Sequence, residues 1–148
     1  MTRFGHVGLC ARDWQKLVTF YVQVFGCEPV GPERDLAGEW LANGCGIPGV
    51  KIRGQHLRLP GHGTEAPTLE VFSYEPALPA GTPMPNRVGY GHICFQVDSV
   101  DEALLRVVTA GGDKFGEPVT AEIPGAGMLQ FVYCRDPEGN VLELQRWD

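Results

Sequence analysis

Residues 4–25, FGHVGLCARDWQKLVTFYVQVF, and residues 90–109, YGHICFQVDSVDEALLRVVT, are two versions of one pattern. Each copy opens with an aromatic residue, a glycine and a histidine, and then alternates apolar and polar side chains, which predicts a short strand. The spacing of apolar residues then changes to that of an amphipathic helix. A strand followed by a helix, found twice, indicates that the chain consists of two related modules.

Both expected helices carry start and stop signals. In the first copy Asp13 is a suitable N-cap, and the apolar positions at helical spacing end at Gly26. In the second copy Ser99 and Glu102 form a capping-box signature, and Gly111 ends the helix. We therefore expect one helix in each half, packed on the apolar side of the strand that precedes it.

A proline-rich stretch separates the two copies. Residues 75–87, EPALPAGTPMPNR, hold four prolines, which exclude a helix and a central strand, so this stretch is expected to be a linker. It divides a single domain, residues 1–148, into a first module at 1–77 and a second module at 88–148. About three strands are expected after each helix. They are predicted at 38–42, 50–59 and 68–74 in the first module and at 114–122, 127–134 and 141–146 in the second.

Four polar residues fall at matching places in the two copies. His6 and His92 lie near the start of each copy, and Glu70 and Glu143 lie in each closing strand. Successive side chains of a strand point to opposite faces, and the neighbours of these four residues are apolar. The apolar neighbours are expected to lie under the helix, so the four polar residues should project from the helix-free face of each sheet. If two such faces curl toward each other, they enclose a cavity.

This donor set points to a metal site. Two neutral imidazoles and two carboxylates in one cavity would be costly to bury without partners. A divalent cation removes that cost, and the set suits Zn, Ni, Co, Mn or Fe(II), with positions left for water or substrate. A single histidine in a strand is usually structural and a glutamate in a last strand is usually solvated, but the duplication favours shared metal binding. His56 and His62 have no partner in the repeat and are interpreted as surface or substrate-side residues.

Charge and composition exclude several classes of partner. The formal net charge is -6 at pH 7 and no run of Lys or Arg occurs, which argues against nucleic acid and anionic membranes. No stretch approaches the roughly 20 apolar residues of a membrane span, and the N-terminus has no secretory signal pattern. The five cysteines are scattered without a C-x-x-C pair, so reduced thiols in a cytoplasmic protein are expected.

Four segments resemble the vicinal-oxygen-chelate superfamily: GHVGLCARD with the following LVTFYVQVFG, then TLEVFSY, GHICFQVDSVDEAL and YCRDPEGNVLELQ. That superfamily includes glyoxalase I, methylmalonyl-CoA epimerase, extradiol dioxygenases, fosfomycin-resistance enzymes and bleomycin-binding proteins. The resemblance covers nearly the whole chain. It implies an α+β fold of two tandem βαβββ modules, which form an incomplete eight-stranded barrel around one divalent metal ion. The ligands carried by the first and last strands of each module would be His6, Glu70, His92 and Glu143.

The resemblance also implies an activity. A carboxylate at Glu70 is similar to glyoxalase I and methylmalonyl-CoA epimerase, whereas extradiol dioxygenases use two histidines and one glutamate. The implied function is that of a metal-dependent lyase or isomerase, which removes a proton beside the chelated carbonyl of a small substrate, with Glu143 or Glu70 as the base. An Fe(II) extradiol-type dioxygenase and a non-catalytic small-molecule (drug) binding protein remain the alternatives. Homodimers are usual in the superfamily.

The substrate is not indicated by any motif. Residues 38–63, GEWLANGCGIPGVKIRGQHLRLPGHG, match the usual pattern of neither glyoxalase I nor the epimerase. Weaker candidates for substrate contacts are Glu39, Arg53, Arg58, Tyr74 and Gln130, with Trp40 and Trp147 as candidates for the cavity mouth.

Overall fold

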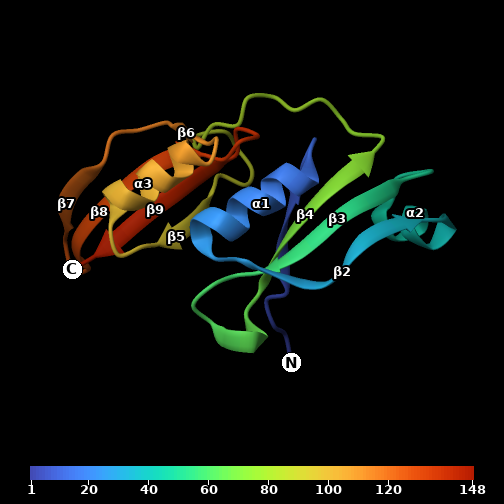
Figure 1. The fold of residues 1–148 in the computed structure, drawn as a ribbon, viewed down its shortest axis with the longest axis horizontal. Helices are drawn as coiled ribbons and strands as arrows, with labels where there is room; N and C mark the ends of the chain where they lie inside the picture. The colour runs from blue at the N-terminus through green and yellow to red at the C-terminus, as the bar shows by residue number, and fades with distance from the viewer. The chain divides into compact units, whose positions relative to one another are not determined.

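The structure is a computed structural model that describes all residues from 1 to 148. The chain divides into two compact units, residues 1–79 and residues 80–148, and each unit contains one sheet (Figure 1). The fold is therefore α+β, as predicted. None of the helices combines the length and the hydropathy that crossing a bilayer requires.

The first unit has a four-stranded mixed sheet in the order β1-β4-β3-β2. β1 is parallel to β4, whereas β3 pairs antiparallel with both β4 and β2. The predicted sequence of a strand, a helix and three further strands is present, with one extra helix. The elements are β1 (His6–Cys10), α1 (Trp14–Phe25), β2 (Glu28–Ala37), α2 (Glu39–Cys45), β3 (Lys51–Arg58), the 3-10 helix η1 (Gly63–Glu65) and β4 (Thr68–Glu75).

The second unit repeats this topology with the order β5-β9-β8-β6, and β7 also pairs with β8. The expected strand at 114–122 is broken into β6 and β7, because residues 115–118 include Gly116 and Pro118. Both pieces pair with β8, so the two units together hold nine strands where eight were expected. The elements are β5 (Ile93–Gln96), α3 (Val100–Thr109), β6 (Asp113–Lys114), β7 (Val119–Ile123), β8 (Gly127–Arg135) and β9 (Val141–Trp147).

The predicted helix ends are confirmed. The backbone N–H of Lys16 donates to Oδ1 of Asp13 over 3.1 Å, and α1 stops before Gly26, whose φ of 69° is left-handed. The backbone N–H of Glu102 donates to Oγ of Ser99 over 3.3 Å at the start of α3. Each cap satisfies a backbone donor that the first helical turn leaves free, and so sets the residue at which the helix begins.

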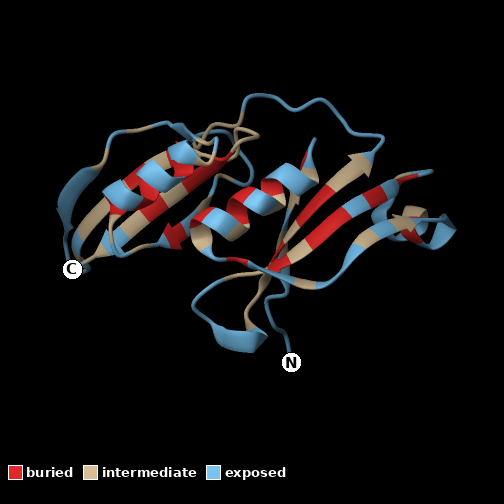
Figure 2. Cartoon of the chain, viewed as in Figure 1, coloured by how far each residue is buried: buried red, intermediate tan, exposed pale blue.

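Each helix buries one stripe against its sheet. The buried residues of α1 are Leu17, Phe20, Tyr21 and Val24, and those of α3 are Val100, Ala103, Leu104 and Val107. Along the strands, buried residues alternate with more exposed ones, as the red bands in Figure 2 show. Burying one large apolar side chain contributes about 1.5–3 kcal/mol, so these stripes hold each helix to one face of its sheet. The opposite face is left for other contacts.

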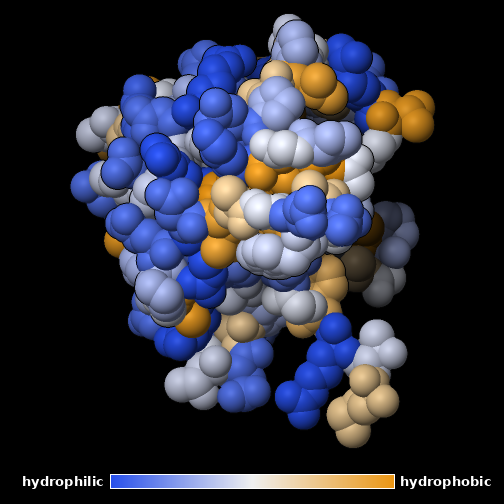
Figure 3. Space-filling model, turned by 90° about the vertical axis from the view of Figure 1, so that its right-hand side faces the viewer, coloured by the Kyte–Doolittle hydropathy of each residue, from blue (hydrophilic) through white to orange (hydrophobic).

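The strand predicted at 38–42 is wrong, because residues 39–45 form α2 and the strand lies earlier, at 28–37. The sequence did not predict β2, because Pro29 and Pro32 argue against a strand. An edge strand tolerates proline, since half of its backbone donors face away from the sheet. Leu41 of α2 packs with Ile52 and Phe72 on the face that α1 does not cover. From the end that carries α2, the surface is mainly hydrophilic with apolar patches between the polar residues (Figure 3).

A buried carboxylate organises the turn between β8 and β9. Asp136 is 2% exposed, and its Oδ1 accepts from the backbone N–H groups of Glu138 and Asn140 over 2.9 and 3.0 Å. Its Oδ2 accepts from the Asn140 side-chain amide over 2.8 Å. These bonds satisfy the charge and set the pairing of β8 with β9, which carries Glu143.

Replacing Asp136 by alanine is expected to lower the free energy of unfolding by about 3 kcal/mol, because hydrogen bonds to a charged acceptor are lost and buried donors stay unpaired. Urea denaturation measures the change. Asp136→Asn is the control and should cost less, since an amide oxygen still accepts one or two of these bonds. A loss below about 0.5 kcal/mol for the alanine variant, the range of an ordinary surface change, would contradict this role.

Two buried thiols predict an alkaline loss of stability. Burial raises the pKa of Cys27 to about 11 and that of Cys134 to about 12, from 9.0 for a free thiol. The unfolded chain loses these protons at a lower pH than the folded chain, so their contribution is complete below pH 9.0 and falls as the pH rises toward the folded values. Each thiol should contribute a slope of about 1.4 kcal/mol per pH unit in that window. Denaturation at several pH values under reducing conditions should show this slope, and Cys27→Ser, which does not titrate there, should show a smaller one.

Candidate metal centre

The face of the first sheet that α1 does not cover brings three ligand-type side chains together. This face also carries α2, so it is not free of helices as the sequence predicted. The strand register places Glu70 beside Gly8 on β1 and opposite His56 on β3. His6 precedes Gly8 by two residues, so its side chain points to the same face. A Cβ added to Gly8 would lie 3.4 Å from Oε2 of Glu70, which shows that the carboxylate reaches over β1.

Each oxygen of the Glu70 carboxylate has an imidazole beside it. Nε2 of His6 lies 3.6 Å from Oε2, and Nε2 of His56 lies 3.3 Å from Oε1. One donor atom from each of the three residues falls within 4.8 Å of the other two. The side chains of Glu70 and His56 are about one-fifth exposed, whereas that of His6 is about half exposed. The cluster is thus a shallow site open on the side of His6.

His56 is oriented by its neighbours. Its Nδ1 lies 3.1 Å from Oγ1 of Thr68, and its ring meets the ring of Phe72 edge to face at 5.4 Å between centroids. Burial lowers the pKa of His56; the nearby Arg34 and His6 charges act in the same direction, and Glu70 opposes them. A neutral ring that donates from Nδ1 to the threonine hydroxyl carries its lone pair on Nε2, which faces Glu70.

The second unit has the matching pair. His92 comes immediately before β5, and its Nε2 lies 2.8 Å from Oε2 of Glu143 on β9. Glu143 lies beside Cys94 on β5 and opposite Tyr133 on β8. The rings of Tyr133 and His92 are 5.0 Å apart between centroids. Burial and the Glu143 charge raise the pKa of Tyr133 above its ordinary value of 10.0, so the phenol keeps its proton at neutral pH.

The spacing of the donor atoms fits a divalent cation. Bonds of about 2.0–2.2 Å to imidazole nitrogen and carboxylate oxygen put neighbouring ligand atoms about 2.8–3.6 Å apart, from octahedral to tetrahedral angles. The separations of 3.6 and 3.3 Å in the first unit and 2.8 Å in the second lie around that range. A lone pair on Nε2 that faces a carboxylate oxygen is unfavourable unless a proton or a cation lies between them. The residues therefore fit the metal that the sequence predicted.

The structure brings His6 and Glu70 together in the first unit, and His92 and Glu143 together in the second. Each pair lies on the sheet face that α1 or α3 does not cover. Their role as ligands of one shared ion stays a prediction. His62 is exposed in the loop before η1, as interpreted from the sequence.

The weaker candidates for substrate contacts lie on different faces of the two sheets. Arg58 and Tyr74 share the face of Glu70, and Trp147 shares the face of Glu143. By strand alternation Arg53 and Gln130 point to the opposite faces, so they lie away from the two pairs. Arg58 donates to Glu28 over 2.9 Å, and Arg53 pairs with Asp35 at 3.4 Å. Glu39 and Trp40 are exposed at the start of α2.

Sequence reasoning placed His56 on the surface or near the substrate, and the structure places it beside Glu70. The repeat could not reveal it, because the residue at the same place in the second unit is Tyr133. Strand alternation within 51–58 could have shown that His56 shares a face with Ile52 and Gly54. Placing His56 beside Glu70 also requires that this strand pairs antiparallel with β4. The antiparallel register was not fixed by the sequence.

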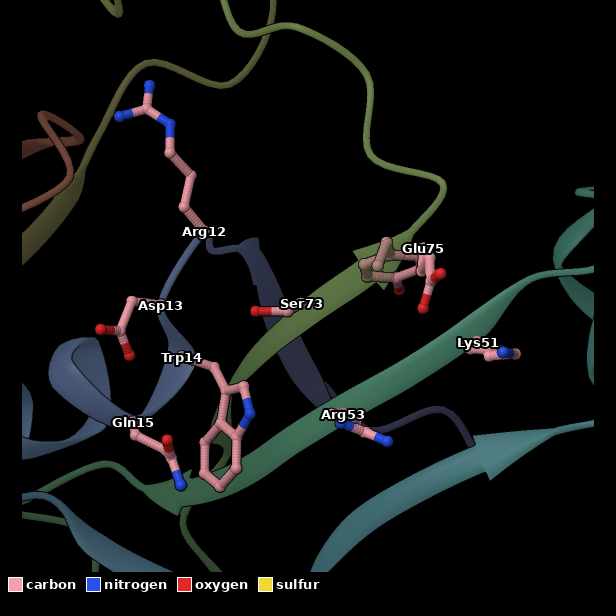
Figure 4. Close-up of a pocket in the computed structure, with 9 residues that line it drawn as sticks. Arg12, Asp13, Trp14, Gln15, Lys51, Arg53, Ser73 and Glu75 are labelled. Atoms are coloured by element: carbon pink, nitrogen blue, oxygen red, sulfur yellow. The ribbon is translucent and has the colours of Figure 1, made fainter.

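A cavity of about 450 Å³ lies on the other face of the first sheet, at the start of α1 (Figure 4). Figure 4 shows Trp14 extending from α1 over β3, next to Arg53. Four of its strand residues, Lys51, Arg53, Ser73 and Glu75, alternate with His56 and Glu70 along β3 and β4, so these side chains point away from the ligand cluster. The lining residues are Arg12, Asp13, Trp14, Gln15, Lys51, Arg53, Ser73, Tyr74 and Glu75.

Comparison with solved structures gives the same fold. A glyoxalase family protein from Bacillus cereus is 20% identical, with a TM-score of 0.83 over 99% of this chain and 95% of that one. A glyoxalase/dioxygenase from Nostoc punctiforme is 20% identical, with a TM-score of 0.65 over 99% and 91%. A mutant of the fosfomycin resistance protein FosX from Listeria monocytogenes, complexed with Mn(II) and 1S,2S-dihydroxypropylphosphonic acid, is 17% identical, with a TM-score of 0.57 over 100% and 94%.

At these identities the likeness concerns the fold alone. No curated protein matches the chain. Residues 3–144 match the model of one protein family, and this match includes both units and all four predicted ligands. The chain therefore belongs to the Glyoxalase/Bleomycin resistance protein/Dioxygenase superfamily.

Proposed function

We propose that this protein is a metal-dependent lyase or isomerase that moves a proton on the carbon beside a carbonyl group of a small oxygenated substrate. The proposed ligands of its one divalent cation are His6 and Glu70 of the first module and His92 and Glu143 of the second, within one chain or across two copies. The observation that carries the proposal is the matched pair of imidazole and carboxylate in each unit, with the nitrogen and oxygen 3.6 and 2.8 Å apart.

The cation would supply Lewis acidity toward two neighbouring substrate oxygens. The carboxylates would then remove and return the substrate proton. Glu143 is the first candidate base, because it is 16% exposed and stands among Cys94, Tyr133 and His92, where little water competes for it. A general base must lie within hydrogen-bond reach of the proton that it removes, and a carboxylate held beside the proposed metal site meets that requirement.

Glu70 is the second candidate base. It is 19% exposed, close to the value for Glu143, and it holds the equivalent position in the first unit. Isomerisation and epimerisation both need proton transfer at two positions of the substrate, and two carboxylates could divide that task. The likeness to FosX supports a small-molecule substrate at the level of the fold, since that protein's structure holds Mn(II) and a small dihydroxy compound.

Solvent deuterium exchange tests the proposal. The metal-loaded protein is incubated in D₂O with α-hydroxy-thioesters, CoA thioesters and catechols, and NMR follows the proton beside each carbonyl. We expect exchange or isomerisation of one thioester class, lost after chelation and restored by a divalent cation. Oxygen uptake with catechols would indicate the dioxygenase instead. Stoichiometric binding of a ligand without exchange, in protein that holds no metal, would indicate a binding protein.

A further inference from the structure

We propose that the first module holds the cation through three protein donors, His6, His56 and Glu70, and retains it without help from the second module. This inference rests on the proposed function and adds one ligand, His56, to the proposed set. The three donor atoms lie within 4.8 Å of one another, and all three residues belong to the first unit. Three protein ligands with an open position are the usual complement of a catalytic metal site.

The geometry around His56 prepares Nε2 for binding. The β3–β4 register puts His56 directly opposite Glu70, so the two side chains leave the sheet side by side. Thr68, two residues before Glu70 on β4, contacts Nδ1 at 3.1 Å. Histidine ligands usually use their other ring nitrogen for such a contact, which fixes the tautomer and the ring orientation. Phe72 packs against the ring edge to face and limits its rotation.

The two modules differ at this position. In the second unit the residue opposite Glu143 is Tyr133, and a phenol is not among the usual ligands of such a cation, which are imidazole, carboxylate and thiolate. That unit therefore offers two ready donors, His92 and Glu143, where the first offers three. Metal affinity grows with the number of correctly placed donors, so we expect the first module to hold the ion and the second to complete the site.

A structural His56–Glu70 ion pair is the competing explanation. Such a pair would need a protonated imidazole, and it would leave metal affinity unchanged when His56 is replaced. A ligand role instead predicts that replacement weakens metal binding while the chain stays folded. His56→Gln is suited to this comparison, because glutamine keeps a polar group of similar reach but lacks the imidazole nitrogen.

The experiment uses the full chain and Co²⁺ as the probe, with affinity measured by competition against a chromophoric chelator. The starting variant is His92→Ala/Glu143→Ala, which removes the donors of the second module. We expect it to bind one Co²⁺ per chain, and we expect the added change His56→Gln to weaken binding by about 100-fold or more, beyond the usual effect of losing a contact behind a ligand. Thr68→Val should weaken it by about tenfold.

His62→Ala in the same background is the matched control and should leave the affinity unchanged, since His62 is an exposed histidine outside the cluster. In ¹⁵N-detected spectra with Zn²⁺, the Nε2 signal of His56 should shift on binding. Loss of all Co²⁺ binding in the starting variant, with binding kept in the wild type, would overturn the three-donor site and leave the proposed function standing. Unchanged affinity after His56→Gln would do the same. Absence of binding in the wild type would refute the proposed function itself.

Discussion

Glu143→Gln is expected to lower turnover by about 10²–10⁴-fold, the usual contribution of a general base. Glutamine has nearly the same shape as glutamate but does not accept a proton at neutral pH. The amide oxygen can still face the cation, and three of the four proposed ligands remain, so part of the metal should stay bound. Turnover of the substrate found by the exchange screen, together with metal content, measures both effects.

Glu122→Gln is the control for the charge change. Glu122 lies on β7, is exposed, and belongs to the same unit as Glu143. Its replacement should leave turnover within about twofold, since screened surface charges contribute little. Full activity of Glu143→Gln would rule this residue out as the base and would direct the same test to Glu70.

Gly54→Val is expected to destabilise the first unit by about 3 kcal/mol or more, at the upper end of what overpacking costs. A Cβ at Gly54 would lie 2.1 Å from the carbonyl oxygen of Val71 and 2.3 Å from Cδ1 of Phe72. Both contacts are with β4, which pairs with β3 at this point. The two strands would have to separate, and Phe72 would have to leave the ring of His56, so metal affinity should fall as well.

Urea denaturation measures the loss of stability. Gly44→Ala is the matched control, because Gly44 lies in α2 and a Cβ there meets nothing within 4 Å. Alanine in a helix is favoured over glycine by up to about 1 kcal/mol, so this control should be neutral or slightly stabilising. If Gly54→Val unfolds at the same urea concentration as the wild type, the close approach of β3 and β4 is not as the structure describes it.

The parts of the fold that local signals specify were predicted from the sequence. The caps at Asp13 and Ser99 predicted where α1 and α3 begin, because each side chain accepts a bond from a backbone N–H of the first turn. Gly26 predicted where α1 ends, because it adopts the left-handed conformation that stops a helix. The duplicated opening then indicated two units. None of this required knowledge of which segments meet in space.

The parts that depend on pairing were not predicted. β2 holds Pro29 and Pro32 and is tolerated only as an edge strand, a place that the sequence does not reveal. α2 is short, and it forms where Leu41 meets Phe72, a contact between distant segments. His56 was missed for the same reason, since its place beside Glu70 follows from the β3–β4 register.

Anomalous diffraction from crystals grown with Zn²⁺ tests the central claim most directly. The account predicts one strong peak for each chain, within about 2.0–2.2 Å of donor atoms from all four residues: His6, Glu70, His92 and Glu143. Nε2 of His56 should lie at a similar distance if the further inference is correct. A difference map with no peak, or a peak bonded to the residues of one module alone, would contradict the shared metal site.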